Sequence, residues 1–304
     1  MSEDEIRLEP EIPAEAAPQP TAEPPKKKKK HKRLGKLLYF VLLAVFATVF
    51  VYCAIYIGDY VIESQQDKDA YDELSDLVNQ YRDQATDPDA TLPTGPDSTD
   101  PDATVDPEAP TAGGILPEYQ AVYELNPDMI GWITVPDTQI DYPVVQSPDN
   151  PNYYLNHNFQ KKWSAGGCIY AREQCDVFTP CDNVVLYGHH MKNGSMFAQL
   201  DKYKKKAFWE EHQTFTFDTL YEHHTYQVIA VFKTSAAVGQ GFSYHIFNTA
   251  ANEAEFNEFI STVHSLQMYD TGLTAQYGDM LLTLSTCEYT LNEGRFVVVA
   301  KRIS

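Results

Sequence analysis

Residues 281–301, LLTLSTCEYTLNEGRFVVVAK, constrain the fold of this chain more than any other stretch. Two runs rich in leucine, threonine and valine flank a short polar stretch with the turn-forming residues Asn292 and Gly294. Such runs are typical of β-strands, so the pattern predicts two neighbouring strands joined by a turn. Cys287 ends the first run and Arg295 begins the second, which should bring both side chains to one end of a sheet. A guanidinium beside a thiol favours the thiolate, the nucleophilic form of cysteine.

Two interpretations of Cys287 are open on this pattern alone. A lone cysteine is often a small, inert core residue, and Arg295 could be a solvated surface charge. The position of Cys287 at a strand end and a histidine-bearing segment upstream favour the catalytic interpretation.

The histidines lie in residues 183–200, NVVLYGHHMKNGSMFAQL. An apolar strand pattern there ends just before Gly188, which permits a sharp turn and would present His189 at the strand end. Histidine in such a place suits general acid–base chemistry. The alternative is that His189 and His190 are ordinary surface-loop residues.

Both segments resemble the active-site motifs of the sortases, particularly class B. TLSTC followed by Arg295 is similar to the signature around the nucleophile, and residues 187–197 are similar to the motif YGHxMxxGxMF. The family most often has asparagine where this chain has His190, so the position in the motif points to His189. The opening of the domain also resembles class B, in NPD at 126–128, IGWI at 130–133, IDYPVVQ at 140–146 and NYYL at 152–155. The resemblance covers almost all of residues 115–304, with one departure at 171–172, where many relatives carry an acidic residue.

The resemblance implies a cysteine transpeptidase of a Gram-positive type cell envelope. Cys287 would attack a threonine carbonyl in the C-terminal sorting signal of a secreted protein, and Arg295 would stabilise the oxyanion or position the substrate. His189 would protonate the leaving amine, and an amine of a peptidoglycan stem or cross-bridge would resolve the thioacyl intermediate. Ser285 and Thr286, directly before the nucleophile, are the candidate substrate-binding residues. No cofactor is expected.

Three further cysteines, Cys168, Cys175 and Cys181, follow the membrane-proximal region, and their roles stay open. A disulfide is conceivable outside the cell, but the odd number of thiols does not favour one. A zinc site from Cys175, Cys181 and His189 or His190 can be drawn, but its spacing matches no usual ligand pattern. We therefore expect no metal ion.

Residues 115–304 have a globular composition and the length of one domain, about 190 residues. Many short strand patterns with frequent turns predict a mainly β fold, a sortase-like closed β-barrel with helical insertions. The predicted strands are 130–135, 140–145, 167–170, 183–187, 215–217, 225–233, 280–285 and 295–301. The predicted helices are 119–125, 197–208 and 252–266, the last with an apolar face.

Residues 37–57 contain no charged residue and predict a single transmembrane helix before the barrel. At 1.5 Å per residue they would span about 30 Å, the thickness of a hydrocarbon core. A cleaved signal peptide competes, but the run is too long and no small-residue cleavage site follows closely. The lysine-rich cluster at 26–33 should stay in the cytoplasm, which sends the catalytic domain out to the cell wall. The prediction is an uncleaved signal anchor whose residues 37–57 contact membrane lipid.

The other segments are polar. Residues 1–33 are predicted to form a disordered cytoplasmic tail with the basic cluster. Residues 59–114 are predicted to form a short helix at 59–82 and a disordered stalk rich in proline, aspartate and threonine. The net charge is −20, and an acidic outer domain would repel nucleic acid, so no nucleic-acid partner is expected.

Two alternatives to a transpeptidase remain. One is a cysteine protease that uses the same residues with water as the acceptor. The other is a non-catalytic surface scaffold on a sortase-like barrel, which is disfavoured because Cys287, His189 and Arg295 are all present.

Overall fold

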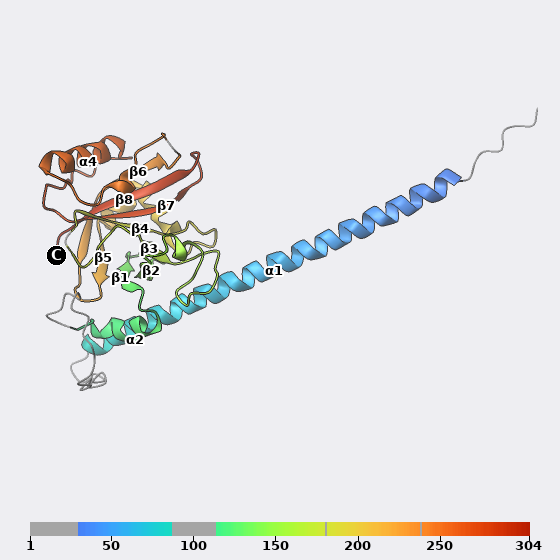
Figure 1. Cartoon of the computed structure of the whole chain (residues 1–304), viewed down its shortest axis with the longest axis horizontal. Helices are drawn as coiled ribbons and strands as arrows, with labels where there is room; N and C mark the ends of the chain where they lie inside the picture. Colours follow the sequence, from blue (N-terminus) through green and yellow to red (C-terminus); the bar gives the residue numbers. More distant parts are fainter. Residues whose placement is uncertain (1–29, 87–113, 180, 238) are drawn as a thin grey trace, which may run out of the picture. The chain divides into compact units, whose positions relative to one another are not determined.

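The structure is a computed structural model that describes residues 30–86, 114–179, 181–237 and 239–304 (Figure 1). The predicted tail up to residue 29 and the predicted stalk at 87–113 lie outside the described residues. The chain divides into two compact units, Met1–Ile57 and Gly58–Ser304, which are described separately.

Eight strands of the second unit close into a barrel in the order β1-β2-β3-β4-β7-β8-β6-β5, with β5 paired to β1. The pairs β2–β3 and β4–β7 are parallel, and the others are antiparallel. The predicted closed β-barrel is confirmed. The strands are β1 (Met129–Thr134), β2 (Asp141–Val145), β3 (Ile169–Ala171), β4 (Asn183–Tyr187), β5 (Thr214–Thr219), β6 (Thr225–Ser235), β7 (Leu281–Glu288) and β8 (Gly294–Arg302).

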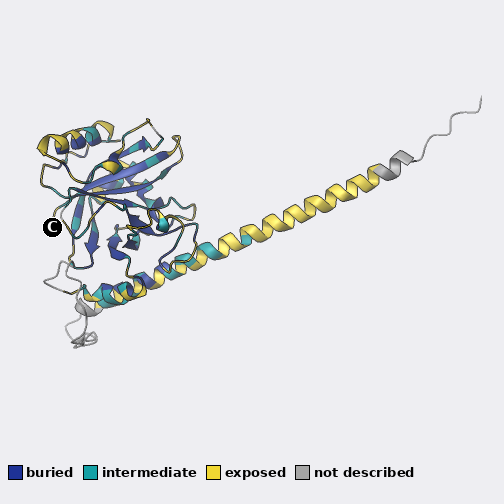
Figure 2. Cartoon of the chain, in the orientation of Figure 1, coloured by how far each residue is buried: buried dark blue, intermediate teal, exposed yellow. Residues whose placement is uncertain are grey.

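Large apolar side chains from most of the strands are buried, and Figure 2 shows the barrel as predominantly buried. Trp132, Phe217, Phe232 and Phe296 are among the largest side chains with almost no exposed surface. Burial of one such side chain stabilises the fold by about 2 to 3 kcal/mol. The strand ends are therefore held by a rigid, close-packed core.

The helical insertions are α2 (Pro117–Leu125), η1 (Tyr153–Leu155), η2 (Phe197–Lys204), α3 (Lys206–Glu211), η3 (Tyr244–Ile246) and α4 (Glu253–Leu266). The predicted helix at 252–266 corresponds to α4, whose Asn252 side chain accepts a hydrogen bond from the Glu255 backbone N–H at 3.2 Å. The single helix predicted over 197–208 is wrong. Lys205 has an extended backbone, with φ −103° and ψ 121°, and separates the 3₁₀ helix η2 from α3. In η2 the side chains of Leu200 and Tyr203 are buried, and the Lys205 N–H donates to the Lys202 carbonyl, a bond between residues three apart that is typical of a 3₁₀ turn.

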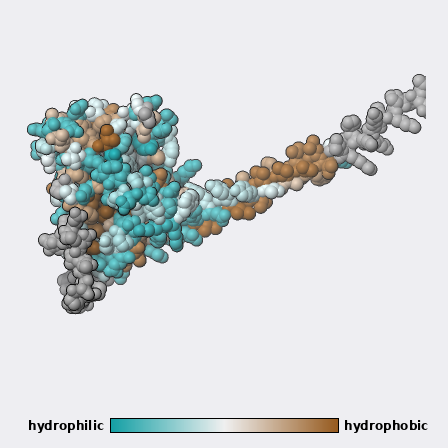
Figure 3. All heavy atoms as spheres, viewed as in Figure 1, coloured by the Kyte–Doolittle hydropathy of each residue, from teal (hydrophilic) through white to brown (hydrophobic). Residues whose placement is uncertain are grey.

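One helix, α1 (Lys30–Thr86), contains both the predicted span at 37–57 and the predicted helix at 59–82. Among the described residues it is the one helix long and apolar enough to cross a membrane. Its side chains over 37–57 are almost all exposed (Figure 2) and form the apolar stretch in Figure 3. In the second unit, Tyr71, Leu74 and Val78 of the same helix are buried.

Candidate active site

The predicted catalytic residues lie on two neighbouring strands of the barrel, β7 and β8, and just after a third, β4. In the antiparallel pair β7–β8, Cys287 is paired with Arg295, as the sequence predicted. In the parallel pair β4–β7, Tyr187 is paired with Ser285. β4 ends at Tyr187, and the Gly188 backbone N–H still donates to the Ser285 carbonyl at 3.1 Å, so His189 follows directly after the end of the strand that neighbours β7. Arg295 thus neighbours Cys287 on the adjacent strand β8, and His189 lies in the segment that leaves the other adjacent strand, β4.

These three residues line one groove of about 440 Å³. Both predicted substrate-binding residues, Ser285 and Thr286, line the same groove. All five residues that the sequence singled out are thus brought together. The groove is completed by Asn152, Leu155, Tyr170, Arg172, Glu173, Tyr187, Gly188, Ala236, Tyr244 and His245.

The imidazole of His189 is oriented by a backbone carbonyl. Its Nε2 lies 2.7 Å from the Leu155 carbonyl oxygen. A carbonyl only accepts hydrogen bonds, so the Nε2 carries the hydrogen and Nδ1 is left to exchange a proton with a ligand. The residue before it has to be glycine, since a Cβ at Gly188 would lie 2.5 Å from Ile169 Cδ1 and 2.7 Å from the Phe197 ring.

His190, the residue after His189, contacts two residues that do not line the groove. His190 Nε2 lies 3.1 Å from Asp201 Oδ2, and its ring meets the Tyr289 ring edge to face with centroids 5.4 Å apart. His190 is not among the residues that line the groove. Of the two histidines, His189 is the one available to a ligand beside Cys287.

Arg295 is anchored by one end of its guanidinium. Nη1 donates to the carbonyl oxygens of Glu293 at 3.2 Å and Gly294 at 3.0 Å. Within the described part of the chain, Nε and Nη2 make no hydrogen bond, so these donors can meet a carbonyl oxygen of a ligand.

Ser285 and Thr286 differ in what their hydroxyl groups contact. Ser285 shares a 2.5 Å hydrogen bond with the hydroxyl group of Tyr244, and both residues are buried. Burial raises the pKa of Tyr244, so its phenol stays protonated. Thr286 is 2% exposed, and its Oγ1 has no partner among the described residues. An unpaired buried hydroxyl costs about 1 to 3 kcal/mol, which a bound ligand could recover.

Sequence reasoning missed two aromatic residues and a histidine that also line the groove, Tyr170, Tyr244 and His245. They come from β3, where the sequence predicted a strand over 167–170 but no site residue, and from η3, where it predicted no element. Burial raises the pKa of Tyr170 to about 12. Burial and the charges of Arg172 and Arg295 lower the pKa of His245, so this second groove histidine favours its neutral form.

Glu288 holds the end of β7 in place. Its side chain is 3% exposed and lies 2.9 Å from Lys233 Nζ and 3.5 Å from Lys204 Nζ. Burial alone would raise its pKa, but hydrogen bonds from Lys233 and Thr290 and the charge of Lys233 outweigh burial and lower the pKa to about 2. Glu288 is therefore ionised and fixes the strand beside Cys287.

The other cysteines show no reactive arrangement. All five cysteines are free thiols. Burial raises the pKa of Cys168 to about 12 and that of Cys175 to about 11, which disfavours their thiolates. Across the described ranges, no group of three histidine, cysteine, aspartate or glutamate side chains is arranged to hold a metal ion.

Comparison with known proteins gives one consistent family. The family model for the sortase domain matches residues 133–303. Sortase B of Listeria monocytogenes is 33% identical over 194 residues, which cover 63% of this chain and 76% of that protein. Sortase B of Bacillus anthracis in complex with AAEK1 superposes with a TM-score of 0.60 at 28% identity, covering 80% of this chain and 99% of that one. The Staphylococcus aureus sortase B–substrate complex gives a TM-score of 0.64 at 25% identity, with the same two coverages.

Proposed function

Because this chain belongs to the sortase family and is a class B cysteine transpeptidase, we propose that it cleaves a C-terminal sorting signal of secreted proteins and joins them to a peptidoglycan amine. One observation carries the proposal: Cys287 is paired with Arg295 and lines a single groove with His189. A nucleophile, a proton carrier and a hydrogen-bond donor for an oxyanion are the three groups that acyl transfer requires.

In the first half of the reaction, the Cys287 thiol passes its proton to His189 Nδ1, and the resulting thiolate attacks the carbonyl carbon of a threonine in the sorting signal. The carbonyl oxygen becomes an oxyanion, which accepts hydrogen bonds from the Arg295 guanidinium. The C–N bond then breaks, His189 gives a proton to the departing amine, and a thioester links Cys287 to the substrate.

In the second half, an amine of a peptidoglycan stem or cross-bridge attacks this thioester. His189 takes a proton from the amine as the new amide bond forms, and the Cys287 thiolate leaves. Water in place of the amine would give hydrolysis, which is the cysteine protease alternative.

The substrate would lie against the Ser285–Tyr244 pair and the unpaired hydroxyl of Thr286. The Thr286 hydroxyl is a donor without an acceptor among the described residues, so a substrate carbonyl is a suitable partner. The Staphylococcus aureus relative has been solved as a substrate complex, which supports a peptide in the corresponding groove of this chain.

We also propose a single-pass anchor. The exposed apolar surface of α1 over 37–57 supports insertion into lipid, and the basic cluster before it supports a cytoplasmic N-terminus. The domain organisation is then a tail at 1–33, the anchor at 37–57, a helix and stalk at 59–114 and the catalytic domain at 115–304 at the cell wall.

The test uses the full-length chain in detergent micelles with a library of sorting-signal peptides, in the presence and absence of an added amine. Mass spectrometry should find the amide product when the amine is present, and Cys287→Ala should give none. Hydrolysis alone at saturating amine would establish the protease instead. No cleavage of any peptide would favour the non-catalytic scaffold.

A further inference from the structure

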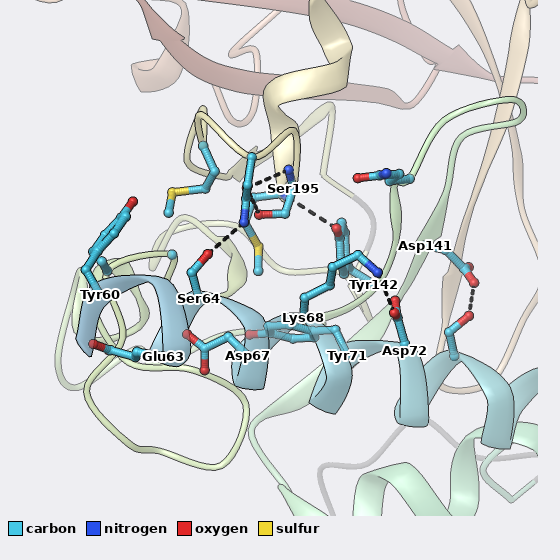
Figure 4. Close-up of a pocket in the computed structure, with 17 residues that line it drawn as sticks. Tyr60, Glu63, Ser64, Asp67, Lys68, Tyr71, Asp72, Asp141, Tyr142 and Ser195 are labelled. Atoms are coloured by element: carbon cyan, nitrogen blue, oxygen red, sulfur yellow. Dashed lines mark hydrogen bonds and ion pairs between the residues drawn. The ribbon is translucent and has the colours of Figure 1, made fainter. Parts of the chain in front are cut away.

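The second half of α1 (residues 58–86) contacts the loop before β3 and the loop that follows His189. Figure 4 shows Ser64, Asp67 and Tyr71 of this helix facing a cavity of about 200 Å³. The same cavity is bounded by parts of the loop before β3 and of the loop after His189. The helix thus touches both chain segments that determine where the His189 imidazole lies.

Asp67 binds the loop before β3 through two buried side chains. Its Oδ1 accepts a hydrogen bond from Asn158 Nδ2 at 2.8 Å, and its Oδ2 accepts one from the Ser164 hydroxyl. Asn158 is 6% exposed and Ser164 is fully buried. Ser164 Oγ also accepts from the backbone N–H groups of Gly166 and Gly167, so Asp67 orders the whole turn.

Tyr71 binds the same loop one helical turn later. Its hydroxyl donates to the Gly167 carbonyl at 2.8 Å, and the side chain is 4% exposed. The ring packs edge to face on Tyr142, with centroids 5.4 Å apart. The Tyr142 hydroxyl in turn accepts a hydrogen bond from the Met196 backbone N–H at 3.2 Å, on the loop after His189.

The loop before β3 also contains η1, whose Leu155 carbonyl is the hydrogen-bond partner of His189. Ser164 N donates to the Asn156 carbonyl at 3.0 Å, and Cys168 N donates to the Tyr154 carbonyl at 3.0 Å. Leu155 lies between these two anchored residues. Its carbonyl position therefore follows from the position of the loop that Asp67 and Tyr71 hold.

The contact at Gly167 is close enough to transmit a displacement. A Cβ at Gly167 would lie 2.5 Å from the Leu155 carbonyl oxygen, so the two backbones are in direct contact. The Leu155 carbonyl oxygen accepts the Nε2–H of His189 at 2.7 Å. A shift of the loop would therefore move the acceptor that sets the tautomer and the direction of the imidazole.

The helix α1 also contacts the loop that follows His189. Asn193 Nδ2 donates to Ser64 Oγ at 2.8 Å, and Asn193 Oδ1 accepts from the Ser195 backbone N–H at 3.0 Å. These residues lie in the loop that follows His189. The helix thus restrains the chain on both sides of the imidazole.

We propose that the 58–86 half of α1 positions His189 for catalysis, with Asp67 and Tyr71 as the positioning residues. The inference rests on the proposed role of His189 as the proton carrier. Since the same helix contains the proposed membrane anchor, the active site would depend on a segment that is separate in sequence from the 115–304 domain.

The test compares Asp67→Asn and Tyr71→Phe with matched controls in the full-length chain. Tyr71→Phe keeps the ring and removes one hydroxyl, so it should fold even if Asp67→Asn does not. Asp72→Asn is the control for Asp67, because Asp72 lies on the same helix, is 60% exposed and pairs only with Lys68 among the described residues. Tyr60→Phe is the control for Tyr71, because Tyr60 is 42% exposed and has no hydrogen bond within the described ranges.

Two readouts separate positioning from simple support of the fold. The first is kcat and KM on a sorting peptide, with the pH dependence of kcat. The second is the imidazole ¹⁵N spectrum of histidine-labelled protein, in which the His189 signals are identified by their loss in His189→Gln. Melting temperature and the alkylation rate of Cys287 report on the fold and on the β7–β8 pair.

We expect Asp67→Asn and Tyr71→Phe to lower kcat by about ten- to hundredfold, the effect of a displacement on the order of 1 Å. KM should stay within about twofold, the pH profile of kcat should shift, and His189 should lose its single Nε2–H tautomer. The two controls should match the wild type. Unchanged kcat and an unchanged His189 spectrum would overturn the proposal, even with a lower melting temperature. If His189→Ala leaves peptide cleavage intact, the proposed role of His189 fails separately, and the ¹⁵N spectrum still decides whether Asp67 and Tyr71 position the ring.

Discussion

Replacing Arg295 with lysine keeps a positive charge beside Cys287 but removes the planar guanidinium. In the structure, Nη1 already donates to the Glu293 and Gly294 carbonyls, and the other nitrogens are left for a ligand. A lysine ammonium is a single donor centre on a flexible stem. It cannot both satisfy those two carbonyls and reach an oxyanion on the far side. The substitution therefore removes one oxyanion-type donor.

Loss of one such donor typically lowers kcat by about 10² to 10³, or roughly 3 to 4 kcal/mol of transition-state stabilisation. We expect Arg295→Lys to show a loss of this size. The Cys287 thiol should remain reactive toward a small alkylating agent, because a cation is still next to it. The two effects of Arg295, hydrogen bonding and charge, can thus be measured separately.

The assay pairs kcat on a cleavable sorting peptide with the pH dependence of Cys287 alkylation, in wild type and Arg295→Lys. Near-normal turnover in the variant would refute the hydrogen-bonding role. A displaced alkylation profile that accounts for the whole loss of kcat would show that Arg295 acts only as a point charge. Melting curves of both proteins control for unfolding.

His189→Ala should abolish peptide cleavage while His190→Ala retains much of it, since His190 is paired with Asp201 outside the groove; the opposite ranking would reassign the proton carrier. The free energy of unfolding should depend on pH through Glu288, because the pKa of this carboxyl is about 2 in the fold against an ordinary value of 4.5. A lowered pKa stabilises the fold above pH ~4.5, by at most about 3 kcal/mol, and this contribution should vanish as the pH falls toward 2. Chemical unfolding at a series of pH values between 7 and 3 measures this loss of stability. Glu288→Gln should remove the part of the pH dependence that Glu288 contributes. Protease added to intact protoplasts should digest the 115–304 domain, and complete protection would contradict the proposed topology.

Much of the groove could be predicted from local sequence. The β7–β8 pair is a strand, a turn and a strand that are adjacent in the chain, so its hydrophobic runs and turn residues define the Cys287–Arg295 pairing. The end of β4 is likewise a local feature, where Gly188 gives the close turn that presents His189. The resemblance to sortases rests on these same local motifs, and the family match bears it out.

The sequence did not predict what surrounds these residues. Three hydrogen bonds each join residues 34 or more positions apart. They are the bond from His189 to the Leu155 carbonyl, the bond between the Tyr244 and Ser285 hydroxyls, and the bond from Ser164 to Asp67. The helix predicted over 197–208 is two short helices, because Lys205 has an extended backbone that ends the helical hydrogen bonding between them. Local residue patterns determine where a strand begins, turns and ends. Which loops meet at its end is decided when the barrel closes, because only the closed order of strands brings together side chains and carbonyls that are far apart along the chain.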